Sequence, residues 1–134
     1  MGIRFLKISV IYFLIGIGFG MFMSISHKFQ YAPTHAHINL LGWTSLALSG
    51  LIYALYPALA EKKLAIFHFW LHNIGLPVMM LGLIWLESGN SSVEPLIAAG
   101  ATVMSLGIIC FTVNVLKNLK TSSEQPAKSK IVSY

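Results

Sequence analysis

The sequence predicts an all-α fold, an integral membrane bundle of four helices. Of its 134 residues, 56% are hydrophobic and only 10% are charged. The mean hydropathy of +0.74 is far above that of a soluble domain, which must keep a polar surface. Four mostly apolar stretches each come close to the ~20 residues that a helix needs to cross a ~30 Å hydrocarbon core. The bilayer is therefore the solvent for which this composition is suited.

The predicted spans cover residues 6–26, 34–57, 64–87 and 95–117. The first span is longer than the apolar core of a signal peptide, so we expect it to remain in the protein. Pro33 and Thr34 fit the first turn and cap of the second span, and Pro77 predicts a kink inside the third. We expect residues 1–120 to form one four-helix domain. Residues 121–134 are rich in Ser and Lys and are expected to form a flexible cytoplasmic tail.

Eight of the nine basic residues fall on one side of the membrane if the spans alternate. These are Arg4, Lys7, Lys62, Lys63, Lys117, Lys120, Lys128 and Lys130. Lys28 alone lies on the other side. Because cytoplasmic loops carry an excess of Lys and Arg, the sequence predicts a multi-pass protein of the cell membrane with both termini in the cytoplasm.

Several classes of function find little support in the composition. The net charge of +5 is divided among separate loops, so we expect the lipid bilayer, and not nucleic acid, as a partner. The chain has no Asp, and its Glu residues lie in predicted loops or the tail, so carboxylate hydrolysis and most proton-coupled transport lack their acidic groups. The single Cys110 excludes a disulfide framework and is expected to pack as a small apolar residue.

Small residues indicate where helices approach one another closely in lipid. The first span contains Gly16, Gly18 and Gly20, and the fourth contains Gly100 and Gly107. We expect both faces to be helix contacts.

Five histidines remain as candidates for chemistry. His35 and His37 stand two apart near the outer end of the second span, so at ~100° per residue their side chains point to opposite sides of one helix. Each could face a different neighbour, and a neutral imidazole in an apolar slot is a usual axial ligand for haem iron. The alternative is a pair of interfacial histidines at the level of the lipid headgroups.

His68 and His72 stand four apart in the third span, so they share one helix face and could hold one metal ion. The zinc-protease helix motif would need Glu where this chain has Phe69. Both lie in the inner half of the membrane, away from the histidine pair of the second span. We therefore expect a structural or second-site role for them, with Asn73 as a hydrogen-bond partner.

Two runs of sequence carry a resemblance. The first reads THAHINLLGW at residues 34–43 and continues to Gly50, Tyr53, Tyr56 and Pro57. The second reads FHFWL at residues 67–71 and continues to Ile74-Gly75, Pro77 and Leu81-Gly82-Leu83. In this order they resemble the His-x-His helix and the helix after it in subunit I of the haem-copper oxidase and nitric oxide reductase superfamily. Together they cover about a third of the chain.

The resemblance implies haem chemistry. In that family the first histidine of the pair ligates the high-spin haem and the second ligates the low-spin haem. It thus implies that His35 and His37 are axial ligands of iron in haem b, and it implies no ligand role for His68. The family's subunit has about twelve spans and a copper site on other helices. This chain shows no copper-ligand set, which leaves open whether it is an enzyme.

Three functional hypotheses follow. The first is a small membrane b-type cytochrome that uses haem for electron transfer or for redox or gas sensing. The second is a haem-dependent oxidoreductase that acts on oxygen or nitric oxide at an open axial position. The third is a transporter or haem-handling membrane protein. His27, near the outer mouth, and His72 are the further candidates for cofactor binding.

The resemblance also implies an assembly. Subunit I looks like three arcs of four helices around a pseudo-threefold axis, and this chain resembles one such arc. A homotrimer, which closed cyclic symmetry allows, could rebuild the larger body. Each haem would then lie between two protomers, held by His35 of one chain and His37 of the next. A monomer or dimer with haem inside one bundle is the alternative.

Overall fold

The computed structural model describes residues 1–119, all of whose regular structure is helical. In chain order the elements are α1 (Gly2–Ser26), η1 (Phe29–Tyr31), α2 (Ala32–His37), η2 (Ile38–Thr44), α3 (Ser45–Leu55), α4 (Pro57–Ala60), α5 (Lys63–Glu87), η3 (Ser91–Val93) and α6 (Glu94–Asn118). Because α2, η2 and α3 run on without a break, the described chain has four long apolar helices, each able to span a membrane. The predicted all-α class with four candidate spans is confirmed.

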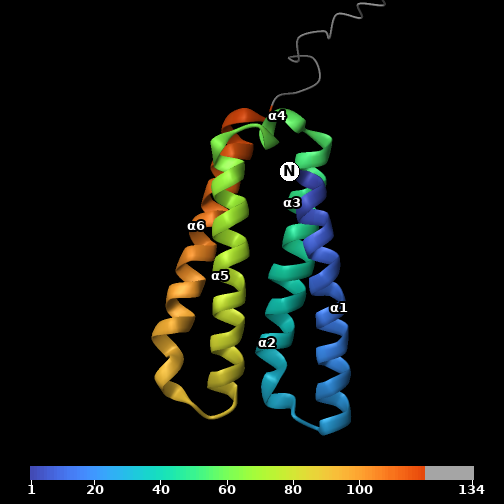
Figure 1. Cartoon of the computed structure of the whole chain (residues 1–134), viewed down its shortest axis with the longest axis vertical. Coiled ribbons are helices and arrows are strands. Elements are labelled where there is room, and N and C mark those ends of the chain that lie inside the picture. Colours follow the sequence, from blue (N-terminus) through green and yellow to red (C-terminus); the bar gives the residue numbers. More distant parts are fainter. Residues whose placement is uncertain (120–134) are drawn as a thin grey trace, which may run out of the picture.

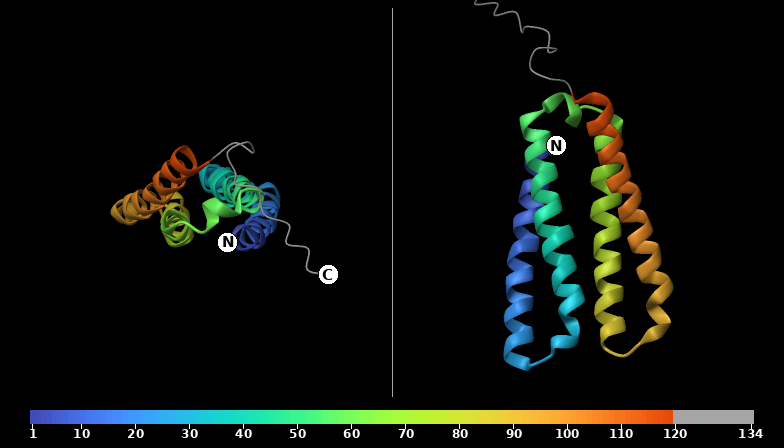
Figure 2. Two further views of the ribbon diagram at one scale, coloured as in Figure 1. Left: turned by 90° about the horizontal axis from the view of Figure 1, so that it is seen from above. Right: turned by 180° about the vertical axis from the view of Figure 1, so that it is seen from behind.

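The helices form two antiparallel hairpins that lie side by side (Figure 1). One hairpin pairs α1 with the α2–η2–α3 helix, and the other pairs α5 with α6. The N-terminus, α4 and the last turn of α6 lie at one end, which we call the α4 end. The connections around η1 and η3 lie at the opposite end, which we call the loop end. Seen from above, α1 and α6 lie on the outer sides of the two hairpins (Figure 2).

The helix bounds differ little from those predicted. Helix α1 begins at Gly2, four residues before the predicted span, and the third and fourth helices extend one residue beyond the predicted spans at their starts. Pro77 lies inside α5, which continues as one helix on both sides of it. The predicted tail, residues 121–134, lies outside the described residues.

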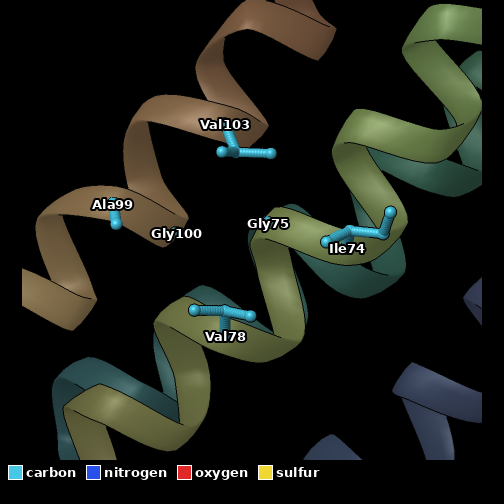
Figure 3. A pocket seen from close by; sticks show the side chains of 6 residues that line it. All are labelled: Ile74, Gly75, Val78, Ala99, Gly100 and Val103. Atoms are coloured by element: carbon cyan, nitrogen blue, oxygen red, sulfur yellow. The ribbon is translucent and has the colours of Figure 1, made fainter.

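Helices α5 and α6 touch through their backbones. A Cβ atom added to Gly75 would lie 2.5 Å from the amide nitrogen of Met104, and one added to Gly100 would lie 2.6 Å from that of Met79. Figure 3 shows the two glycines on neighbouring helices, where both line an apolar pocket. The close contact predicted for the small face of the fourth span is thus present, and Gly75 is its counterpart on the third.

In the first hairpin, glycines of α1 likewise allow close contact with the second long helix. A Cβ atom on Gly16 would lie 2.5 Å from the amide oxygen of Asn39, and one on Gly20 would lie 2.9 Å from Cε1 of His35. Gly18, which points elsewhere, has no atom within 4 Å of such a Cβ. The first span therefore contacts the second through two of its three glycines.

Two buried clusters join the hairpins. The cluster nearer the α4 end consists of Phe5, Leu46, Tyr53, Leu59 and Ala65. The cluster nearer the loop end consists of Ile38, Leu76, Met79, Met80 and Met104. Many other large apolar side chains point outward, among them Leu14, Trp70 and Leu116. This outward apolar surface is what hydrocarbon requires, since lipid tails offer no partner for polar groups.

Candidate functional site

His37 is held in a defined orientation. Its Nδ1 lies 2.7 Å from the carbonyl oxygen of Pro33, one turn earlier in α2. A carbonyl can only accept, so Nδ1 carries the proton and donates, and Nε2 keeps its lone pair. The side chain is half-buried. An imidazole anchored at one nitrogen and open at the other is the usual form of a metal-ligating histidine.

His35 lies on the other side of the same helix and packs against α1. Its ring sits on Gly20, where a side chain would displace it. Asn39 donates to the backbone carbonyl of His35 at 2.9 Å, and the same amide group lies 3.5 Å from His35 Nδ1, at the limit of a hydrogen bond. The ring is half-buried. Since α2 is helical at both histidines, the opposed directions expected from the two-residue spacing follow.

The helix that carries the two histidines is fixed at its start by Glu87, the last residue of α5. One carboxylate oxygen accepts from the Thr34 backbone amide at 3.2 Å, and the other accepts from the Thr34 hydroxyl at 2.6 Å. Tyr31 and Ser88 make a hydroxyl pair beside it at 3.1 Å. Thr34 was expected to act as a cap; instead it donates to Glu87, which fills that role from another helix. Glu87 had been assigned to an outer loop, and no local pattern links it to Thr34.

Directly after the two histidines the helix widens into the π-helical segment η2. The backbone amide and hydroxyl of Ser45 both donate to the carbonyl of Leu40. The carbonyl of Leu41 accepts from Nε2 of His72 at 3.0 Å. Short π-helical segments are frequent at functional sites, and here the segment links the helix of His35 to α5.

His68 and His72 are fully buried. Nδ1 of His68 lies 3.1 Å from the Tyr53 hydroxyl, and His72 donates to Leu41. The expected partner Asn73 is not used: its amide donates to the carbonyl of Phe69 in its own helix. That expectation was wrong because the true partners come from neighbouring helices. His72, a candidate for cofactor binding, has one nitrogen committed to the fold.

His27 ends α1 in the left-handed conformation, with φ 55°. Its side chain is exposed, in the connection between α1 and η1. His27, a further candidate for cofactor binding, therefore lies in a turn at the loop end, outside the helix of His35 and His37.

The structure keeps the candidate ligands apart. Among residues 1–119, no group of three or more His, Cys, Asp or Glu side chains is placed to hold a metal ion. His35 and His37 each offer one nitrogen on a different side of α2. A haem with two axial histidines therefore needs its second ligand from another helix or another chain.

Comparison with known proteins agrees with the resemblance of the two sequence runs. The chain is 33% identical over 79 residues to cytochrome c oxidase subunit 1 of Rhodobacter capsulatus, covering 48% of this chain and 15% of that protein. It is 29% identical over 97 residues to a bacteroid homolog of cytochrome c oxidase subunit 1 from Bradyrhizobium diazoefficiens, covering 63% of this chain and 18% of that protein. No family model matches the chain, and no solved structure matches it.

The chain thus spans less than a fifth of the length of the curated relatives that it matches. It is a membrane protein with a distant, partial similarity to cytochrome c oxidase subunit 1 of the haem-copper oxidase superfamily.

Proposed function

We propose that this chain is a membrane b-type haem protein in which His35 and His37 ligate haem iron for electron transfer. The orientation of His37 carries the proposal, since its Nδ1–H donates to the Pro33 carbonyl and Nε2 is left free to ligate. The distant similarity to cytochrome c oxidase subunit 1 supports the choice of haem as the ligated group.

The residues fit the proposed cofactor. Neutral imidazole is a standard axial ligand of haem iron, and both rings are half-buried in an apolar helix pair. Gly20 gives the ring of His35 the room that any side chain would remove. When bound, haem supplies one-electron chemistry, while the protein orients the ligands and excludes water. Glu87 contributes by fixing the turn that contains Pro33 and Thr34.

The opposed directions of the two rings favour an assembly of several chains. An iron ligated by two histidines needs two imidazoles, and each face of α2 offers only one. In a homotrimer, His35 of one chain and His37 of the next would complete each site, with one haem per chain. Helices α1 and α6 lie outermost (Figure 2), and exposed apolar side chains on them offer faces for neighbouring chains.

Two axial histidines favour electron transfer over oxygen or nitric oxide chemistry, because they leave no open position on the iron. The difference spectrum of the purified, dithionite-reduced protein tests this. Sharp α and β bands that carbon monoxide does not change are expected. Bands shifted by carbon monoxide would indicate an open site and an oxidoreductase, and the lack of a Soret band would exclude haem and favour a transporter.

Two histidine variants and one control variant test the ligand assignment. His35→Ala and His37→Ala should each abolish the low-spin spectrum or convert it to a high-spin one. His27→Ala, which removes an exposed histidine at the same end, should leave it unchanged. Full low-spin haem in the His35→Ala, His37→Ala double variant would refute the assignment.

A further inference from the structure

Two nitrogen atoms in the core have no partner. Nε2 of His68 and Nδ1 of His72 are fully buried and make no hydrogen bond. A buried polar atom without a partner costs about 1–3 kcal/mol, so such atoms call for an explanation such as a bound ion or water. Both atoms belong to one helix face, because the two residues are one turn apart in α5.

The hydrogen bonds of the other two ring nitrogens indicate whether the unpartnered nitrogens carry a proton or a lone pair. Nε2 of His72 must donate to the carbonyl of Leu41, so Nδ1 of a neutral His72 has a free lone pair. When Nδ1 of His68 donates to the Tyr53 hydroxyl, 3.1 Å away, Nε2 of His68 also has a free lone pair. Each ring is then anchored by one nitrogen and basic at the other, as in ligating histidines.

We propose that Nε2 of His68 and Nδ1 of His72 bind one soft monovalent metal ion of the Cu(I) class. The ring centroids lie 5.5 Å apart at an interplanar angle of 61°. An ion shared by two nitrogens needs bonds of about 2 Å each, whereas a bridging water needs two contacts of about 2.7–3.2 Å. A ring separation of 5.5 Å is short enough for one ion to contact both rings.

The lack of nearby negative charge favours a monovalent ion over a divalent one. The chain has no Asp, and within the described residues Glu61, Glu87 and Glu94 lie at helix ends, away from this pair. A divalent ion would remain uncompensated in a membrane interior, where charge is costly. Imidazole binds copper as well as zinc, iron and nickel, and the single positive charge of Cu(I) is the smallest of these to bury.

Aromatic rings surround His68. Phe5 of α1 stacks on the His68 ring at 4.8 Å, and Phe111 of α6 lies 4.9 Å from it. Tyr53 of α3 lies at 5.9 Å and supplies the hydroxyl. Aromatic rings packed around a fully buried His68 exclude water from its free nitrogen.

Anaerobic titration of the haem-free full chain in detergent with Cu(I), against a chromophoric chelator, tests the proposal. One ion per chain is expected, with X-ray absorption showing two nitrogen neighbours at about 2 Å. His68→Phe and His72→Phe should each lower the affinity at least about 100-fold, because each removes one of two ligands. Tyr53→Phe should lower it by about 10–100-fold, the usual effect of losing a group that orients a ligand.

Two controls separate this site from others. Tyr12→Phe removes a hydroxyl from another partly buried tyrosine, and His27→Ala removes an exposed histidine. Both should bind Cu(I) as the native chain does. Absence of stoichiometric binding in the native chain, or binding unchanged in Tyr53→Phe and in both histidine variants, would overturn the proposal. Because His35 and His37 are untouched, either result leaves the haem proposal to its own test.

Discussion

The orientation of the His37 imidazole rests on a series of hydrogen bonds that starts at Glu87 of α5. Glu87 accepts two hydrogen bonds from Thr34, and the neighbouring Pro33 carbonyl accepts from His37. A carboxylate bound at the first turn of a helix also interacts favourably with the positive end of that helix. Glu87 thus ties the second hairpin to the helix that carries both proposed ligands.

Replacing Glu87 by Ala should therefore lower both stability and haem content. The Thr34 amide and hydroxyl lose their acceptors, which costs about 1–3 kcal/mol when such groups stay buried. Thermal unfolding in detergent and the haem to protein ratio measure the two effects. Glu61→Ala, which removes an exposed carboxylate between α4 and α5, is the matched control. Equal behaviour of the two variants would mean that Glu87 does not position the ligands.

Sequence periodicity was sufficient for the opposed directions of His35 and His37, because helix geometry alone decides them. The roles of Glu87 and Tyr53 were not predictable in this way. Glu87 lies 53 residues from Thr34, and Tyr53 meets His68 only because two helices pack together. The nearer Asn73 was the natural choice from spacing, but its amide bonds within its own helix.

Close helix contact makes Gly100 sensitive to a single added methyl group. A Cβ there would lie 2.6 Å from a backbone nitrogen of α5, so the helices must move apart. Gly100→Ala should destabilise the protein by about 1–3 kcal/mol. Gly18→Ala, with no atom within 4 Å of the new Cβ, should be neutral or slightly stabilising. Unfolding in mixed detergent micelles compares them, and equal stability would show that α5 and α6 do not pack so closely.

The four long helices were predictable because length and hydropathy determine a membrane span. The π-helical segment Ile38–Thr44 was not. Side chains of two other helices contact this segment. Leu41 accepts a hydrogen bond from His72 of α5, and Gly42 lies against the ring of Tyr12 of α1. Contacts between helices produce no repeating residue pattern, so the sequence alone does not predict them.

The orientation of the protein in the membrane stays a prediction from charge. Arg4 lies near the start of α1, Lys62 between α4 and α5, and Lys117 near the end of α6. These segments meet at the α4 end, so the positive-inside rule makes that end cytoplasmic. Reporter fusions after Asn118 should read cytoplasmic, and fusions between Ser88 and Ser92 should read external. The reverse pattern would invert the assignment.

The arrangement of chains could be inferred from the sequence only through the resemblance to a larger subunit. The structure adds that His35 faces α1, while His37 is anchored within its own helix. The two rings point to opposite sides of α2, so they cannot both ligate one iron, and no group of three or more metal-ligating side chains lies within residues 1–119. The proposed function therefore requires that neighbouring chains complete each site.

Native mass measurement of the detergent-solubilised complex, with haem quantified on the same sample, tests this requirement most directly. We expect three chains of 14.7 kDa with close to one haem per chain. The assembly should lose haem when either His35 or His37 is replaced by Ala. A monomer that retains low-spin haem would contradict the account, because one chain would then supply both axial ligands.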